Sequence, residues 1–523
     1  SKQILIMKKI LLSLFLAGSL LTSCDMDTTP DGSIQLEGGI QKMTDITDQR
    51  TGLYAALRSR CGGSYTALSD LQTDLFIGTM NNGNYYTAFS TGNMLSNNGD
   101  IVSFWSAPFS GIMQVNYFLE QVDEFLSKHE TTDAQKATIE LYIAEAKFMR
   151  AYYNYMLVYY FCGKYDAATA TAPATGIPIC LKYVPTEKRD EYPGRNTLAE
   201  SYTQIEKDIA DAITGLEKWE ETDKSALNAM GGGGYLNSYA AKALKSRVAL
   251  MKGDYATAES VSKEIIESQM FPLTQIADYA NMWKNDTGDE LIFQPFADAK
   301  QSGSVPTPGG IYFGVNPRSV NWIPAANVIY DYIIFNNRQV RDVRLNAFIA
   351  ETNDIYNGGQ YTTPVFYKYP GNTKFNSGNT NAQKNLPKPF RTSEQYLILA
   401  ESATQLGHFA DANAALNELR AARIQGFSDL NYGSKEALMN QVKLERAKEL
   451  IGEGFRLGDL RRWGDGFSRD GDYESIGYDL NGYIINSAVQ VSFSPNDYRY
   501  VWPIPSAEMI VNPQLKGQQN PGY

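Results

Sequence analysis

The chain has 523 residues, with 58 acidic against 47 basic side chains and a formal net charge of −11. This length allows one large or two ordinary domains with a substantial core. No basic run interrupts the chain after its N-terminal segment, so the composition excludes nucleic acid as an expected partner.

Residues 1–24 predict a secretory signal. Lys8 and Lys9 precede the apolar run Ile10–Leu21, which leads through small residues to Cys24. A basic region, a short apolar region and a small-residue cleavage site define such a signal, and the run is shorter than the ~20 residues of a transmembrane helix. The segment resembles a bacterial lipobox, whose cysteine is acylated; an ordinary cleaved signal is the alternative. We expect membrane attachment through this lipid anchor only.

The next segment, residues 25–38, is polar and rich in Asp, Thr and Gly, which predicts a flexible tether. We expect one domain over residues 39–523. Its first clear helical block is Ala134–Phe161, where apolar residues recur at intervals of three and four.

Two later blocks predict helical hairpins. Tyr235–Ser268 is split at Gly253 and Ser393–Arg423 at Gly407, and in both an aromatic residue and then alanines follow the glycine at the same offsets. A turn glycine with small residues beyond it lets two antiparallel helices approach closely, as in tetratricopeptide-like repeats. A partial copy at Gly163 is soon stopped by prolines. We therefore expect a mostly α fold, a tetratricopeptide-like helical-hairpin scaffold with minor β structure.

Two insertions separate these blocks, at about 62–110 and 281–385. Both are rich in Gly, Asn, Ser, Pro and aromatic residues. Loops of this length in a compact protein are usually functional, so we look for the binding site there.

Besides Cys24, the chain contains Cys61, Cys162 and Cys180, and three thiols cannot all pair within one chain. A Cys162–Cys180 disulfide is one reading, and buried free thiols are the expected one. Neither of the two histidines has metal-ligand spacing around it, so we expect no metal and no cofactor.

Several motifs occur in a fixed order along the chain: Glu145–Ala151, Asp342–Arg344, Phe390–Leu397, Leu444–Trp463, Trp502–Pro505 and the final Gln519–Tyr523. Together they resemble the SusD/RagB family of outer-membrane nutrient-binding lipoproteins of Bacteroidetes. The sequence departs from the usual family pattern at Cys162, Gly163 and Lys164. We expect the motif residues to hold the fold together without touching ligand. Arg446 and Glu449, three positions apart on a helix, can pair across one turn.

The resemblance implies a cell-surface protein that captures glycan and passes it to a SusC-like TonB-dependent transporter. Peptide capture, as in the RagB branch, is the first alternative. A helical-repeat scaffold for protein assembly is a further one. No nucleophile elbow, phosphate loop, zinc motif or marked acid/base pair is present, so we expect no catalytic residues and no enzyme.

A sugar-binding surface needs a flat aromatic platform flanked by Asn, Asp, Gln or Arg. For each tryptophan below, core packing is the competing interpretation; for the two adjacent tyrosines it is an exposed turn without function. The candidate ligand-binding residues in the two insertions are Asn81, Asn84, Tyr85, Tyr86, Trp283, Tyr312, Arg318 and Trp322.

Overall fold

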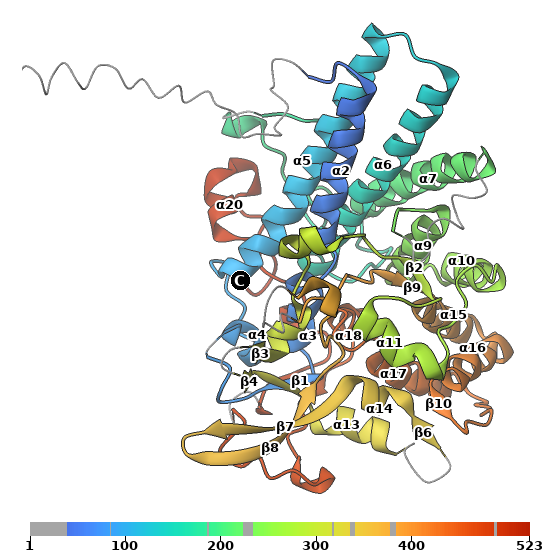
Figure 1. Ribbon diagram of the computed structural model, residues 1–523. Coiled ribbons are helices and arrows are strands. Elements are labelled where there is room, and N and C mark those ends of the chain that lie inside the picture. Colours follow the sequence, from blue (N-terminus) through green and yellow to red (C-terminus); the bar gives the residue numbers. More distant parts are fainter. Residues whose placement is uncertain are drawn as a thin grey trace, which may run out of the picture.

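Three long helices from the N-terminal third stand side by side at one end of the molecule (Figure 1). In the computed structural model they are α2 (Met43–Arg60), α5 (Gly99–Lys128) and α6 (Asp133–Phe161). The structure describes residues 39–523 except 84, 186–187, 223–233, 316–317, 335–339, 377–382 and 486–488. The expected signal with Cys24 and the expected tether 25–38 lie outside the described residues.

The starts of α5 and α6 are set by their capping side chains. Asn98 accepts hydrogen bonds from the first N–H groups of α5, and Thr132 and Gln135 form a capping box at α6. The helix expected over Ala134–Phe161 is confirmed. The insertion expected over 62–110 is too long, because α5 begins at Gly99 and contains its last twelve residues.

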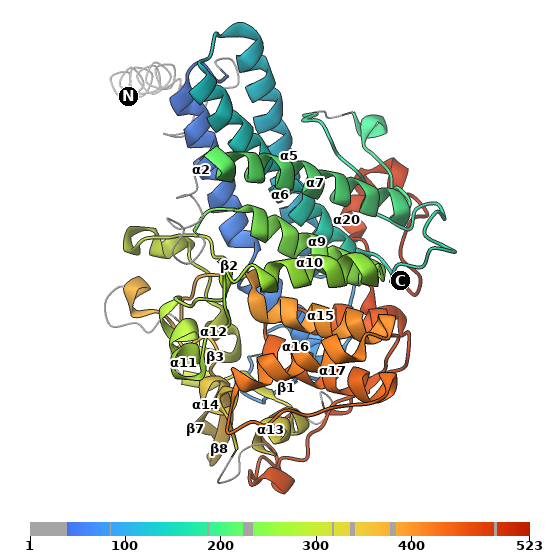
Figure 2. The same ribbon diagram turned by 90° about the vertical axis from the view of Figure 1, so that its right-hand side faces the viewer.

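Antiparallel helix pairs continue the scaffold, and Figure 2 shows them stacked below the long helices. Both predicted breaks are confirmed: Gly253 and Gly407 end their helices in the left-handed region, with φ of 77° and 82°, a conformation that glycine adopts without strain. The stacked helices are α7 (Leu198–Thr222), α9 (Ser238–Lys252), α10 (Tyr255–Glu267), α15 (Thr392–Leu406), α16 (Phe409–Ala421) and α17 (Lys435–Leu450).

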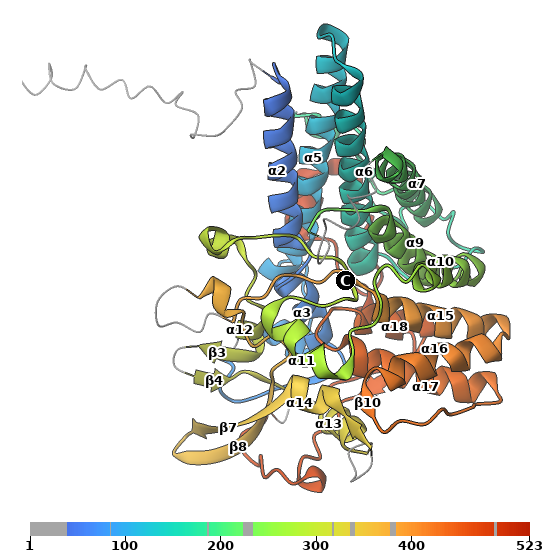
Figure 3. The same cartoon turned by 45° about the vertical axis from the view of Figure 1, so that its right-hand side comes forward.

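Short helices and small antiparallel strand pairs make up both insertions and parts of the C-terminal segment, and the strand pairs formed within the second insertion lie on the side away from α15–α17 (Figure 3). The short helices are α3 (Ser64–Leu71), α4 (Thr87–Thr91), α11 (Ile276–Asn285), α12 (Pro308–Tyr312), α13 (Ala326–Ile333), α14 (Val343–Phe348), α18 (Arg456–Trp463) and α20 (Ser506–Val511). The pairs are β1 (Phe76–Gly78) with β5 (Trp322–Pro324), β2 (Leu291–Phe293) with β9 (Phe390–Arg391), β3 (Phe313–Val315) with β4 (Arg318–Val320), β6 (Arg341–Asp342) with β10 (Ile424–Gln425), β7 (Ile349–Tyr356) with β8 (Gly359–Phe366), and β11 (Phe467–Ser468) with β12 (Ser492–Phe493). The expected mostly α scaffold with minor β structure is therefore confirmed.

Charged side chains from three of the sequence motifs meet inside the protein. Glu449 of α17 accepts hydrogen bonds from Arg391 (2.8 Å), Arg344 (3.1 Å) and Arg423 (3.2 Å). We call the buried ion-paired group the ionic frame; its members are Glu290, Asp342, Arg344, Arg391, Arg420, Arg423, Glu445, Lys448 and Glu449. All of these side chains are 0 or 1% exposed.

Burial alone would raise the pKa of Glu449, but the adjacent Arg423, Arg391 and Arg344 hold that pKa well below its ordinary value. Removing one partner from such a network leaves an uncompensated buried charge. The family-like motifs thus form the interior of the fold. The expected pairing of Arg446 with Glu449 is wrong, because Arg446 reaches Asp459 on α18 instead, at 2.7 Å, while Glu449 faces the other arginines.

Cys61, Cys162 and Cys180 are free, the first two buried and the third partly buried, so the expected free thiols are confirmed. Across the described ranges, no helix combines the length and apolar character needed to span a bilayer. The same ranges contain no group of three or more His, Cys, Asp and Glu side chains placed to hold a metal ion.

Candidate functional site

The β7–β8 hairpin projects from the insertion side of the molecule (Figure 1). Its turn is made by Asn357 and Gly358, both with positive φ, which matches the right-handed twist of the two strands. Next to the hairpin lies the loop that leaves β1. The backbone N–H of Met80 donates to the carbonyl of Tyr483 at 2.7 Å, which attaches this loop to the C-terminal part of the chain.

Asp354 of β7 joins these loops. Its carboxylate, 7% exposed, accepts hydrogen bonds from the Asn81 amide (2.9 Å), the Val320 backbone N–H (3.1 Å) and the Tyr483 hydroxyl (2.5 Å). Burial and the bond to Asp354 raise the pKa of Tyr483, so its hydroxyl remains a proton donor. The Asn81 amide also donates to the carbonyl of Ile355 at 3.0 Å. One carboxylate therefore fixes the relative positions of four segments.

Three apolar side chains are exposed on the segments that this carboxylate joins. Tyr85 is 70% exposed, Ile355 69% and Met80 42%. We call Met80, Asn81, Tyr85 and Ile355 the tip surface. A flat phenol ring and a carboxamide fixed by hydrogen bonds, on one loop, are the combination that suits a pyranose. The ring contacts one face of the sugar, and polar groups form hydrogen bonds at its rim.

Tyr86 supports the tip surface from below. It has a φ of 58°, begins α4 and packs partly against the core, with its ring centroid 6.4 Å from that of Tyr85. Asn81 and Tyr86 thus act mainly through their contacts within the protein, and Tyr85 is the aromatic side chain of this loop that faces solvent.

Three of the expected platform residues are wrong. Trp283, Tyr312 and Trp322 are at most 1% exposed, so a ligand at the surface cannot stack on them. Trp283 packs edge-on against Phe348 at 5.9 Å and lies under the Lys368 ammonium. Their burial explains the pattern that suggested a site: aromatic residues in a loop-rich segment with little helix must supply its core.

Two further candidates fall at the limit of what the structure describes. Asn84 lies outside the described residues. Arg318 begins β4 and pairs with Val315 of β3, and its side chain is outside the described part of the chain.

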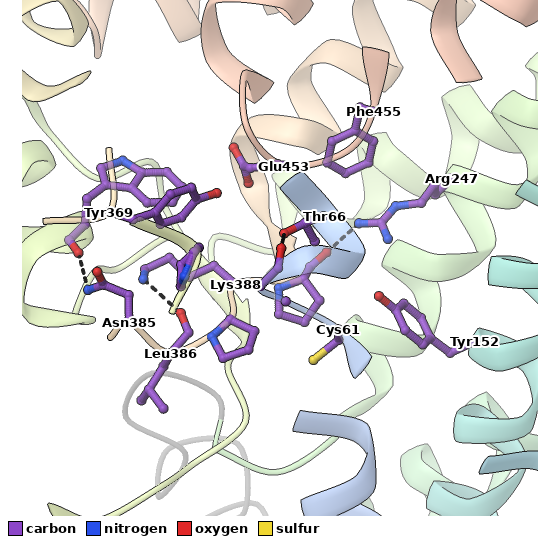
Figure 4. A pocket seen from close by; sticks show the side chains of 16 residues that line it. Cys61, Thr66, Tyr152, Arg247, Tyr369, Asn385, Leu386, Lys388, Glu453 and Phe455 are labelled. Carbon is purple, nitrogen blue, oxygen red and sulfur yellow. Dashed lines mark hydrogen bonds between the residues drawn. The ribbon is translucent and has the colours of Figure 1, made fainter. Parts of the chain in front are cut away.

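An interior cavity lies between the β9 region and the long helices (Figure 4). Tyr152, Arg247, Lys388 and Glu453 line it, and its volume is about 50 Å³. That space holds a few waters and is far too small for a sugar. The tip surface is therefore the better candidate for ligand capture.

Sequence reasoning missed Asp354, Met80 and Ile355. The Asn357–Gly358 pair between two stretches of alternating pattern is a hairpin signal that could have located β7 and β8. No local signal could have shown that Asn81 reaches a residue 273 positions away.

Two family models match the chain. The SusD family matches residues 322–523, and a model described as starch-binding, associating with outer membrane, matches residues 26–250. A SusD-like protein of Formosa agariphila is 22% identical over 460 residues, which covers 80% of this chain and 79% of that protein.

Solved structures share the fold at low identity. The crystal structure of a SusD superfamily protein from Bacteroides thetaiotaomicron has a TM-score of 0.74 and 23% identity, covering 92% of this chain and 100% of that one. A SusD-like carbohydrate binding protein from Bacteroides vulgatus has a TM-score of 0.71 and 18% identity, covering 92% and 98%. A laminarin binding SusD-like protein has a TM-score of 0.66 and 20% identity, covering 92% and 100%.

The matched models cover both halves of the chain, and the motifs that suggested the resemblance form the ionic frame of this fold. The chain belongs to the SusD/RagB family.

Proposed function

We propose that this protein is a cell-surface lipoprotein that captures glycan at the tip surface and passes it to a SusC-like TonB-dependent transporter. The observation that carries the proposal is the 70% exposed Tyr85 ring on a loop held by Asp354. Solved relatives described as carbohydrate or laminarin binding support the ligand class. The lipobox at Cys24 and a matching model described as associating with the outer membrane support the location.

The proposed chemistry is binding without bond cleavage. Tyr85 supplies an apolar face, and an open surface admits a chain of sugars from either side. Both amide N–H groups of Asn81 are engaged within the protein, so Asn81 offers the sugar only its carbonyl oxygen as an acceptor. Transfer to the transporter and lipid anchoring rest on the family resemblance. Peptide capture is the competing outcome of the experiment below.

The test is affinity electrophoresis of the protein without its signal, across laminarin, starch, xylan and mannan, with a peptide mixture as competitor. Calorimetry with the retarding glycan, and with the peptide mixture, follows. We expect Tyr85→Ala to weaken binding by about 2 kcal/mol, roughly thirtyfold, because the variant loses the contact between ring and sugar face. Tyr330→Ala is the matched control, since Tyr330 is 53% exposed on α13. Retention of full affinity by Tyr85→Ala, or binding of peptides and no glycan, contradicts the proposal.

A further inference from the structure

A second pocket, away from the tip surface, lies where the C-terminal segment crosses the turn after α6. Its volume is about 640 Å³, within the range of sites that hold small molecules. It is bounded by residues 163–175, the start of α7, the end of α18, residues 496–501 and residues 517–521. Figure 2 shows the C-terminus on the side where these segments meet. We call this space the tail pocket.

Two buried arginines line the tail pocket without a carboxylate partner. Arg195 and Arg461 are 8% and 6% exposed. Within the described ranges, neither has an Asp or Glu oxygen within 4 Å, whereas Arg344 and Arg391 of the ionic frame pair with several. The chain thus contains buried arginines with carboxylate partners and others, such as Arg58, without one within the described residues, and both arginines of the tail pocket are of the second kind.

Carbonyl and amide oxygens accept hydrogen bonds from the guanidinium groups of both arginines, but they use only some of the N–H donors. Each of the three guanidinium nitrogens of Arg195 is engaged, since they donate to the carbonyls of Gly176, Gln518 and Phe161 and to the Asn520 side chain. Arg461 uses Nη1 alone, which donates to the carbonyls of Tyr159 (2.7 Å) and Tyr500 (3.0 Å).

The Nε and Nη2 groups of Arg461 donate to no described residue, and they are not among the enclosed atoms that lack a partner. They are therefore accessible donors on a side chain that lines the pocket. A nearly buried cation is costly without an anionic partner, so these open donors are suited to bind one.

The rim of the pocket carries a positive charge, as its interior does. Lys164 is exposed at the rim and makes no ion pair with the described residues. Asp497 also lines the pocket, but its carboxylate is already paired with Arg499 at 2.7 Å. Cations thus concentrate locally in a chain whose formal net charge is −11.

The other lining residues can contact the apolar part of an organic ligand. Pro173, Leu198 and Pro521 line the pocket, together with the half-exposed ring of Tyr498. We infer that the tail pocket binds a small organic anion of about monosaccharide size, whose carboxylate or sulfate lies on the open donors of Arg461 and whose body lies against Tyr498. This inference does not rest on glycan capture at the tip surface, because no residue of that surface lines the pocket.

Calorimetry on the same protein tests this site with three probes: galacturonate, galactose 6-sulfate and neutral galactose, at constant ionic strength. We expect one acidic sugar or both to bind with single-site saturation and a dissociation constant below about 1 mM, and galactose not to bind there. The two acidic probes distinguish a carboxylate from a sulfate ligand. Absence of saturable binding by both overturns the inference.

Variants place the binding in the tail pocket. Because Arg461 also holds two backbone carbonyls, the first variant is Lys164→Glu at the exposed rim, which we expect to weaken acid binding about fivefold or more by charge reversal. Tyr498→Ala should weaken it through loss of the apolar wall. Lys245→Glu, on an exposed position of α9, is the matched control and should change nothing. Acid binding that Lys164→Glu and Tyr498→Ala leave unchanged contradicts the assignment, even if Tyr85→Ala abolishes glycan binding.

Discussion

The ionic frame and the tip surface both depend on a carboxylate that gathers several partners, but the two regions differ in what the carboxylate holds. In the ionic frame, Glu449 binds arginines, and every charge is enclosed. At the tip surface, Asp354 binds an amide, a backbone N–H and a hydroxyl, and the side chain presented to solvent is Tyr85.

This difference separates the residues that stabilise the fold from the surface at which we propose that ligand binds. The residues that mark the family lie in the ionic frame, so they specify how the scaffold packs and give no information about ligand. The tip surface is built on loops held by that scaffold, and its exposed residues can change without a cost to the core. Substitutions in the two regions should therefore affect different measurements.

The largest effect is expected in the ionic frame. Glu449→Gln removes the negative charge that three arginines share and turns an amide group toward their N–H donors, so we expect a loss of about 3–5 kcal/mol in the free energy of unfolding. The measurement is the urea midpoint at pH 7, read by circular dichroism.

Glu124→Gln is the control for that variant. Glu124 pairs with Lys128 on the surface of α5, where both side chains are at least half exposed. An exposed pair of this kind contributes little to stability, because water and salt screen the attraction. Equal midpoints for Glu449→Gln and Glu124→Gln would show that the ionic frame is not a source of stability.

Acid should weaken the ionic frame next. Partner charges hold the pKa values of Glu445 and Glu449 below the ordinary value of 4.5, so these carboxyls stabilise the folded state above that pH and lose their contribution as the pH falls below it. Since each tenfold change in proton affinity corresponds to about 1.4 kcal/mol, we expect unfolding stability to fall by a few kcal/mol between pH 4.5 and 3. Urea midpoints across this range measure it.

Asp70 should change the stability in the opposite direction as the pH rises, which makes that test more specific. Burial raises its pKa to about 7 from an ordinary 3.8, so the folded state retains a proton that the unfolded chain releases, and stability decreases as the pH rises from about 4 to 7. The two contributions together place the stability maximum near pH 5. A profile that rises steadily from pH 5 to 7 would contradict this assignment.

The scaffold could be predicted from sequence because its signals are local. Gly253 and Gly407 mark hairpin turns within a few residues, and the long α6 has an apolar period along its whole length. The contacts of Arg446 could not be predicted from sequence, because its helix presents several carboxylates within reach. Only the packing of α18 against α17 selects Asp459. Local spacing gives possible partners, and tertiary structure decides among them.

The candidate site residues differ in the same respect, namely how far local sequence can identify their position. Asn81, Tyr85 and Tyr86 stay candidates: the sequence suggests them because polar and aromatic residues adjoin in one short loop. Trp283 and Trp322 were misassigned because sequence does not distinguish an aromatic residue that covers the core of an insertion from one that faces solvent.

The smallest effect on stability, and the most informative for the comparison, is expected at the junction of tip surface and scaffold. Asn81→Ala removes two hydrogen bonds, to Asp354 and to the carbonyl of Ile355, while Asp354 keeps the Tyr483 hydroxyl. We expect a loss of about 1 kcal/mol in unfolding free energy, because the remaining partners keep the carboxylate satisfied. Glycan affinity should fall severalfold, less than for Tyr85→Ala, since the loop loses its anchor but keeps its ring.

Asn417→Ala provides the matched control. Asn417 on α16 is likewise partly buried, and its side chain also makes two hydrogen bonds, both to the backbone of Leu430. The two variants should lower the urea midpoint by similar amounts, and only Asn81→Ala should weaken glycan binding in calorimetry. Identical binding by both would mean that the anchor does not position the ring, and the functional role of the tip surface would then rest on Tyr85 alone.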